Sequence, residues 1–218
     1  MSEIHQYLKD VINNRYDLNL DLFDWNGILI GKMTPLTKSH FTDDFVIEKL
    51  TLWRNQNMNC FLTQFIATHK RTKKWLQDVV FETPGQILFL IYSDNQLIGH
   101  LGFKNLTCDD VLLDNAMRGE RGGHPRLLQI AGQTLNKWLF NEVRVKTIYG
   151  YVLTTNIPAI MMNKQLGFGG WNKYPLIKKY ENNETRWVLG DKNDESAEGI
   201  YCYKIILEAP NINNGRHS

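Results

Sequence analysis

The sequence is poor in cysteine, and the few cysteines it has are scattered. It holds 3 cysteines in 218 residues, at Cys60, Cys108 and Cys202, with no C-x-x-C pair. A disulfide framework needs an even set, and a cysteine zinc site needs closely spaced pairs, so both are excluded. Sparse, unpaired cysteine is typical of a reducing compartment, and we expect a cytoplasmic protein that binds no metal.

Long apolar runs and strong net charge are absent as well. No run approaches the roughly 20 apolar residues of a transmembrane helix, and the opening stretch MSEIHQYLKDVINN is too charged for a signal peptide. The formal net charge is +2 without a long basic block, which argues against a broad nucleic-acid surface. We therefore expect neither a membrane nor a nucleic acid among the partners.

What the sequence does contain is a conspicuous helix in the stretch RGERGGHPRLLQIAGQTLNKWLF, residues 118–140. Leu127, Leu128, Ala131 and Leu135 recur at spacings of three and four, which predicts a helix with one apolar face. Pro125 suits the first turn of that helix, because the missing N–H costs nothing there. The N-cap is then His124 or Gly123.

Glycines and arginines gather just ahead of this helix. They are Gly119, Gly122, Gly123, Arg118, Arg121 and Arg126. Glycine lets a backbone approach a ligand closely, and a helix N-terminus offers unpaired N–H groups with partial positive charge. The segment suits a phosphate or pyrophosphate, although a flexible loop with solvated arginines would look the same in isolation. A nucleotide-hydrolysing P-loop is excluded, because no Lys-Ser/Thr follows the glycines.

The other segments predict a mixed α/β (α+β) domain. Helical patterns cover 3–14 (weak), 40–55, 67–81 with Thr68 as its cap, and a short stretch from Asn156 ended by Gly167; strand patterns cover 27–33 stopped by Thr34-Pro35, 87–93, 96–106, 110–117, 146–153, 185–189 and 200–207. The two strands around Asp94-Asn95 read as a hairpin. The order strand, helix, strand from 110 to 153 implies a right-handed crossover with parallel pairing. The result is a mixed sheet with helices on both faces.

Three stretches carry a resemblance to a known family. LIGHLGFKNL (97–106), MRGERGGHPRLL (117–128) and NIPAIMMNKQLGF (156–168) resemble, in order, the third strand, the pyrophosphate loop and the N-x-x-A-x-x-x-Y-x-K-x-G-F segment of the GNAT acyltransferase superfamily. The third match is the strongest, whereas the loop departs from the usual glycine spacing. The resemblance covers roughly 27–207. It leaves residues 1–26 as an N-terminal extension and 208–218 as a disordered tail, and it implies a mostly antiparallel sheet with a central parallel splay.

The resemblance implies acetyl-CoA as co-substrate and no metal. The loop would bind the pyrophosphate arm through backbone N–H groups, the strand at 115–117 would pair with the pantetheine, and the thioester would sit where this strand splays from 148–153. The implied donor-binding residues are Ala116, Met117, Arg118, Gly119, Arg121, Gly122, Gly123, His124, Arg126, Asn156 and Asn163.

One position departs from the family pattern. Asn163 stands where many members have a tyrosine that protonates the leaving thiolate. The usual acid is therefore missing unless Tyr149, Tyr151 or Tyr174 takes over its role. A non-catalytic, acetyl-CoA-binding scaffold is the alternative.

Catalytic candidates follow from chemistry and position. His100 and Asp114 lie on strands facing the expected cleft and could act as the base, and Asn156 would reach into it. The ordinary readings are a packed strand histidine and a structural carboxylate paired with an arginine. The expected oxyanion donors are backbone N–H groups of the strand ending at Met117.

The acceptor is expected to be a small amine. The element Trp53-Arg54-Asn55 is assigned to substrate binding, since it resembles the ribosomal-protein and amino-sugar acetyltransferase subgroups; a helix cap is its ordinary reading. By that analogy we expect a nucleotide-linked amino sugar of surface-polysaccharide biosynthesis, with a protein N-terminus or lysine as the alternative. The helix within 1–26 could cover a sheet edge, close over the pocket or join two subunits into a homodimer.

Overall fold

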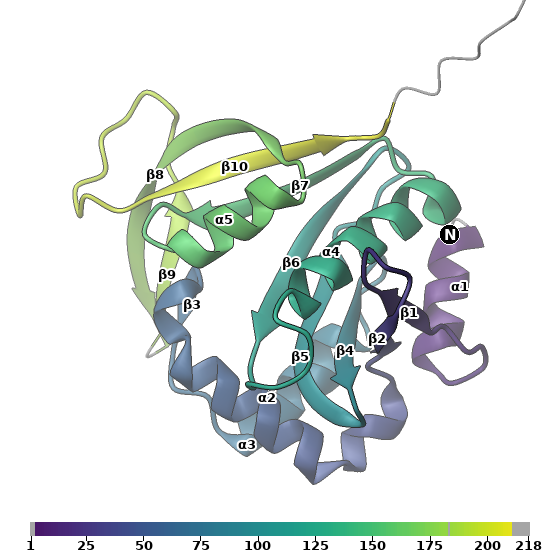
Figure 1. Cartoon of the computed structure of the whole chain (residues 1–218). Coiled ribbons are helices and arrows are strands. Elements are labelled where there is room, and N and C mark those ends of the chain that lie inside the picture. Colours follow the sequence, from purple (N-terminus) through teal and green to yellow (C-terminus); the bar gives the residue numbers. More distant parts are fainter. Residues whose placement is uncertain (1–2, 183, 211–218) are drawn as a thin grey trace, which may run out of the picture.

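A computed structural model describes residues 3–182 and 184–210, which form one ten-stranded sheet in the order β1-β2-β4-β5-β6-β7-β10-β8-β9-β3 (Figure 1). The strands are β1 (Leu20–Phe23), β2 (Leu29–Pro35), β3 (Thr63–Gln64), β4 (Ile87–Ser93), β5 (Gln96–Lys104), β6 (Asp110–Arg118), β7 (Thr147–Leu153), β8 (Gly169–Glu181), β9 (Glu184–Leu189) and β10 (Tyr201–Glu208). The helices are α1 (Glu3–Ile12), α2 (Asp44–Gln56), α3 (His69–Trp75), α4 (Leu127–Trp138) and α5 (Ile157–Gln165). Neighbouring strands are antiparallel, apart from the parallel pair β6–β7.

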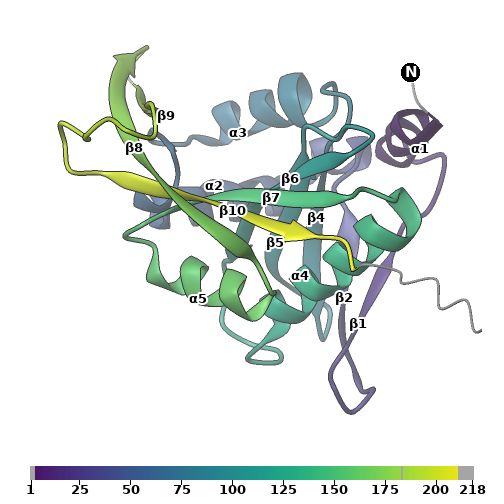
Figure 2. The same cartoon turned by 90° about the horizontal axis from the view of Figure 1, so that it is seen from above.

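Helices cover both faces of the sheet, as predicted. Figure 2 shows α1 and α3 on one side and α4 and α5 on the other. The ring of Trp53 on α2 lies 6.0 Å from that of His100 on β5, whereas Phe103 on β5 meets Trp138 of α4 at 6.1 Å. The two sides are called the α2 face and the α4 face below. Within the described residues, no helix combines the length and apolar character needed to cross a membrane.

The predicted parallel pairing of β6 and β7 is confirmed, and it is short. It joins Asp110 to Thr147, Val111 to Ile148 and Leu112 to Tyr149, and it stops there. Figure 1 shows the two strands together at one end and spreading apart toward the other. Beyond Leu112 the edge of β6 that faces β7 therefore has no ladder partner in β7, and the two strands splay apart.

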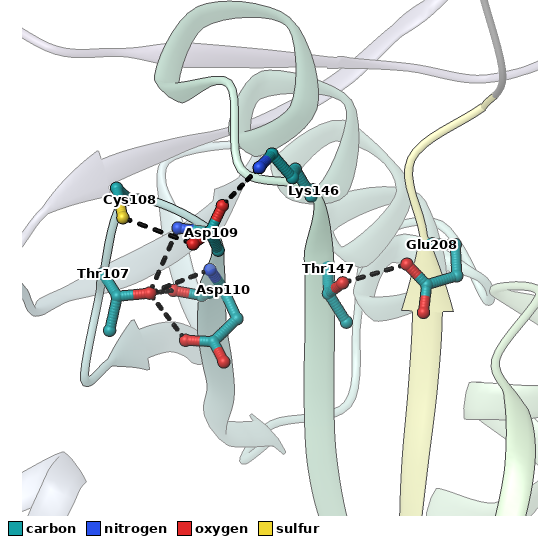
Figure 3. A network of polar contacts seen from close by, with 7 residues as sticks. All are labelled: Thr107, Cys108, Asp109, Asp110, Lys146, Thr147 and Glu208. Carbon is teal, nitrogen blue, oxygen red and sulfur yellow. Dashed lines mark hydrogen bonds and ion pairs between the residues drawn. The ribbon is translucent and has the colours of Figure 1, made fainter.

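The end at which β6 and β7 are paired is held by polar contacts (Figure 3). The Thr107 hydroxyl donates to Asp110 Oδ1 at 2.7 Å and accepts from the Asp110 N–H at 2.9 Å. Lys146 Nζ lies 2.6 Å from Asp109 Oδ1, and that hydrogen bond lowers the pKa of Asp109. The backbone N–H of Thr147 also donates to the Asp109 carbonyl at 3.0 Å. These bonds fix the point from which β6 and β7 diverge.

The N-terminal segment belongs to the same core as the rest of the chain. We predicted residues 1–26 as an extension ahead of the domain. In the structure Leu8, Val11 and Ile12 of α1 are buried in the main core, and β1 adds an edge strand to β2. Of the three roles considered for the N-terminal helix, covering the sheet is the one the packing supports.

Several strands escaped the sequence patterns. The patterns did not indicate β1 or β3. They also did not indicate the 13-residue β8, because its lysines and Gly169-Gly170 interrupt the alternation of apolar and polar residues. Thr34-Pro35 forms the last two residues of β2 instead of stopping the strand before them.

The prediction of a disordered tail from residue 208 onward is wrong for its first residues. Glu208 ends β10, and the Ala209 N–H donates to the Lys146 carbonyl at 2.8 Å. The remainder of that prediction, residues 211–218, lies outside the described residues.

The burial of α1 can be tested by truncating one side chain. Leu8→Ala should lower the free energy of unfolding by about 2–5 kcal/mol, because it removes a fully buried side chain and leaves a cavity. Lys9→Ala, on the exposed side of the same helix, should change it by less than about 0.5 kcal/mol. Urea unfolding of the full chain measures both; equal, small effects would mean that α1 is a detachable appendage.

Candidate active site

Aromatic and polar side chains lie on the α2 face where β6 and β7 splay apart. Tyr149 occupies the last parallel pair, and Tyr151 follows two residues further on, in the open part. Their rings meet edge to face at 6.1 Å. Burial raises the pKa of Tyr151, with smaller contributions from Tyr149, Cys202 and Tyr174. Tyr151 therefore keeps its phenolic proton at neutral pH.

Arg118 organises the loop that follows β6. Its guanidinium donates to the carbonyl oxygens of His124 at 3.1 Å, Pro125 at 3.3 Å and also Gly122. The N–H groups of residues 121–124 donate to no partner among the described residues. We predicted Arg118 as a phosphate ligand; in the structure its guanidinium instead holds the loop, and anion binding by the backbone N–H groups stays a prediction.

The glycines of the loop meet hard steric limits. A Cβ on Gly119 would lie 2.0 Å from the Trp53 ring, so only glycine fits beneath α2. Gly122 has a φ of +123°, a conformation essentially restricted to glycine. The close approach and free N–H groups fit the narrow, doubly charged pyrophosphate arm expected there.

The helix after the loop starts later than predicted. Regular α4 begins at Leu127, two residues beyond Pro125. The predicted N-cap, His124 or Gly123, is therefore wrong: Arg126 occupies that position and makes no side-chain cap hydrogen bond. His124 lies in the turn before it, where its Nδ1 accepts from the Arg126 N–H at 3.2 Å and its carbonyl accepts from the Leu127 N–H at 2.9 Å. His124 thus turns the chain into the helix.

Glu120 is a site residue that the sequence analysis missed. Its Oε1 lies 2.7 Å from Lys49 Nζ and accepts from Trp53 Nε1 at 3.1 Å. These hydrogen bonds, Lys49 first, lower the pKa of Glu120. The N–H groups of Gly119 and Glu120 both donate to the Ile98 carbonyl at 2.9 Å. The loop is therefore anchored to α2 and to β5. The only sign of this role in the sequence was the position of a carboxylate between Arg118-Gly119 and Arg121-Gly122.

The Trp53-Arg54-Asn55 element is structural for the most part. The Asn55 side chain accepts from the Ala67 N–H at 2.8 Å and donates to the Ala67 carbonyl at 3.0 Å. Trp53 is fully buried. The substrate role predicted for these two is corrected, because internal hydrogen bonds use the polar groups of both.

Arg54 differs from its two neighbours in the chain. Its guanidinium carbon lies 3.6 Å from the Phe61 ring and 4.9 Å from the Phe65 ring, and Nη2 donates to the Thr63 carbonyl at 2.6 Å. Burial lowers the pKa of Arg54 to about 10, against the opposing field of Asp114. Arg54 Nε is buried without a hydrogen-bond partner among the described residues. A positive charge with an unused donor thus remains near Asp114.

His100 holds the bulge in β6. Its Nδ1 donates to the Asn115 carbonyl at 2.6 Å, where the β5–β6 register shifts and Asn115 has a left-handed φ of +54°. The side chain is buried, and burial lowers the pKa of His100 to about 4. A histidine that binds protons so weakly and donates its N–H to the backbone fits the reading as a packed strand residue better than that as a base.

Asp114 lies on β6 beyond the last residue pair with β7. Its Oδ2 lies 2.8 Å from Lys104 Nζ and accepts from Asn115 Nδ2 at 2.9 Å, and its side chain is 31% exposed. It shares the α2 face with Tyr149, because Asp114 and Leu112 are two residues apart on one strand and Leu112 pairs with Tyr149. The arginine partner considered for it is replaced by a lysine.

The remaining predicted residues lie at the start of α5 and at the end of β6. Asn156 caps α5, with Oδ1 accepting from the Ala159 N–H at 3.2 Å. Asn163 is buried and donates to the Ala159 carbonyl at 2.8 Å, while its Oδ1 has no partner among the described residues. On β6, Ala116 is exposed and Met117 is buried.

Comparisons with known proteins agree with this arrangement. Residues 44–188 match the family model described as an acetyltransferase (GNAT) domain. A GNAT-family acetyltransferase from Bacillus anthracis is similar at 14% identity, with a TM-score of 0.59, covering 88% of this chain and 99% of its own. A spermidine N-acetyltransferase from Vibrio cholerae (11%, TM-score 0.57, 81% and 94%) and a ribosomal L7/L12 alpha-N-protein acetyltransferase (13%, 0.53, 83% and 96%) are also similar. No curated protein matches the sequence.

Removing the Arg118 fork should loosen the loop. Arg118→Leu leaves three carbonyl oxygens without their shared donor, and each bond to a charged group contributes about 1.5–3 kcal/mol. We expect trypsin to cleave after the exposed Arg121 at least roughly 10-fold faster than in the parent chain. Cleavage after Arg144, beyond the other end of α4, is the internal control, and an unchanged ratio of the two rates would contradict the assigned role.

His100 should make stability depend on pH in a defined window. The unfolded histidine takes up a proton near pH 6.5 and the folded one only near pH 4, so the unfolded state binds more protons between them. Stability therefore falls as the pH drops from 6.5 to 4, by about 3 kcal/mol from this group. Urea unfolding of the parent and of His100→Asn at pH 7 and pH 4 isolates the effect. Parallel losses in both proteins would mean that His100 does not contribute.

Proposed function

The chain belongs to the GNAT acetyltransferase family, and we propose that it transfers acetyl from acetyl-CoA to the primary amine of a nucleotide-linked amino sugar. The family match carries the enzyme class, an acyltransferase with acetyl-CoA as donor. The acceptor is argued from the chain's own residues. The feature that carries it is the set of basic and aromatic side chains on the α2 face beside the β6–β7 splay.

On the donor side, the loop and the open edge of β6 divide the work. The free N–H groups of 121–124 and the start of α4 suit the pyrophosphate. The unpaired edge of β6 after Leu112 suits the amide groups of an extended arm, which would add to the sheet as a strand does. When bound, acetyl-CoA supplies the thioester at the splay, and backbone N–H groups near the bulge are the candidate donors to its carbonyl.

Proton transfer is assigned to two residues on the α2 face. Asp114 is partly exposed beside the splay and is the candidate base for the incoming amine, with Lys104 holding its carboxylate in place. Tyr151 keeps its proton at neutral pH and is the candidate acid in place of Asn163. His100 acts as a positioning residue through Asn115, and Asn156 acts through the start of α5.

The acceptor side carries cations beside aromatic rings. Lys204 Nζ lies 5.5 Å from the centre of the Tyr149 ring, and Lys204 pairs with Tyr151 across β7 and β10. Tyr174 and Trp187 pack with Tyr151 around the buried Cys202, at the side of this face. Lysine and arginine suit phosphate oxygens, and flat rings suit a base or a sugar.

Other acceptors fit less well. The Vibrio cholerae structure is named for spermidine, a polycation that Lys104, Lys204 and Arg54 would repel. A protein N-terminus, as in the name of the ribosomal acetyltransferase, is the second candidate. Asn163, in place of the usual acid, favours a third reading, a scaffold that binds acetyl-CoA without turnover. Unpaired cysteines, Cys60, Cys108 and Cys202, support a cytoplasmic setting.

The class and the acceptor can be tested in one series. Calorimetry with acetyl-CoA comes first, followed by thiol release with nucleotide-linked amino sugars, spermidine and an N-terminal peptide. Binding with thiol release on a sugar nucleotide alone is the expected result. Release only on the peptide would replace the proposed acceptor, and binding without any release would identify a scaffold.

A matched pair of lysines tests the acceptor face. Lys204→Ala should raise the KM for the sugar nucleotide roughly 10-fold, because it removes a charged contact to phosphate, and should leave acetyl-CoA affinity unchanged. On β8, Asn172 pairs with Lys204, so the next residue, Lys173, faces the opposite side of the sheet from Lys204. The Nζ of Lys173 lies 3.8 Å from the centre of the Tyr201 ring. Lys173→Ala should change neither quantity. Equal effects of the two substitutions would place the acceptor elsewhere.

A further inference from the structure

The turn between β1 and β2 presents a tryptophan that the fold itself does not use. Asp24 Oδ1 accepts from the N–H groups of Asn26 at 2.8 Å and Ile28 at 2.9 Å, and Gly27 has a φ of +76°. This bonding makes a tight, well-defined turn. Trp25 stands at its tip and is 65% exposed, although such a large ring is highly buried on average.

The ring of Trp25 lies against the loop that precedes α4. It meets the His124 ring edge to face at 5.3 Å, and the Arg126 guanidinium carbon lies 5.2 Å from its centre. The position is set by the fold, because β1 packs against α4 and pairs with β2. A segment from the start of the chain thus supplies an aromatic face beside the loop's free N–H groups.

We propose that Trp25 binds the adenine ring of acetyl-CoA, with Arg126 and the exposed Arg121 taking the adjacent phosphate of the ribose. The inference rests on the proposed function, since it requires the pyrophosphate to occupy the loop at 121–124. Adenosine is joined directly to that pyrophosphate, so its base must lie within a short reach of the loop. The guanidinium of Arg126 lies over one face of the indole. The rest of the ring is exposed, so the other face can stack with an adenine base.

The composition of this corner matches a phosphorylated purine nucleoside. A base stacks on an aromatic ring whatever its sequence, and arginine binds phosphate through paired N–H donors. The competing explanation is a contact between copies of the chain, because Phe23, Ile28 and Leu29 on the same hairpin are also more than half exposed. That explanation predicts dependence on Phe23 as well as on Trp25, whereas adenine recognition predicts dependence on Trp25 alone.

The test compares two donors that differ by the 3′-phosphorylated adenosine monophosphate unit. Calorimetry gives the Kd of acetyl-CoA and of acetyl-4′-phosphopantetheine for the full chain, for Trp25→Ala and for Phe23→Ala. Trp25→Ala should weaken acetyl-CoA binding roughly 10-fold, the loss of one stacked base, and leave the shorter donor unaffected. Phe23→Ala, on the same hairpin, should change neither Kd.

Each other outcome overturns the inference in a distinguishable way. An unchanged acetyl-CoA Kd in Trp25→Ala, or equal losses for both donors, rejects the adenine contact while the proposed function stands. A shift in sedimentation coefficient for both variants without a change in Kd identifies the hairpin as a contact between copies. If the parent chain binds neither donor, the proposed function fails, and the adenine contact fails with it.

Discussion

Two parallel strands that stay hydrogen-bonded for only three residue pairs govern the rest of this molecule. The pairing of β6 with β7 ends at Leu112 and Tyr149, after which the edge of β6 faces an opening instead of a neighbour. Backbone groups left in this way need partners, and an extended ligand arm can provide them. The opening is stable because its two ends are fixed separately: the Asp109–Lys146 contacts hold the strands together, and the bulge at Asn115, held by His100, turns β6 away.

The loop after β6 and helix α2 form one rigid unit with this opening. Gly119 lies directly under the Trp53 ring, and Glu120 accepts from Trp53 while it pairs with Lys49. Arg118 donates to three loop carbonyls from within, and the N–H groups of 121–124 have no partner among the described residues. Arg118, which we expected to bind the ligand directly, thus shapes the loop backbone that we propose binds it. Asn55 fixes the chain between α2 and α3 through its two hydrogen bonds with the backbone of Ala67.

Local patterns predicted much of this architecture. The hairpin at Asp94-Asn95, the helix cap at Thr68 and the crossover from β6 through α4 to β7 all follow from periodicity and turn chemistry, which act over a few residues. The strands β1, β3 and β8 could not be predicted from such patterns, because their pairing depends on partners far away in the chain. Side-chain roles were also hard to predict: burial decides that His100 has a pKa of about 4, and burial is a property of the whole fold.

Amide hydrogen exchange with and without acetyl-CoA is the most direct test of the central claim, that the open edge of β6 and the following loop form one donor site. The account predicts slower exchange at 115–118 and at 121–124, the two stretches of backbone offered to the ligand, and little change in β4 or in α1. Binding accompanied by protection elsewhere, with these two stretches unchanged, would contradict it.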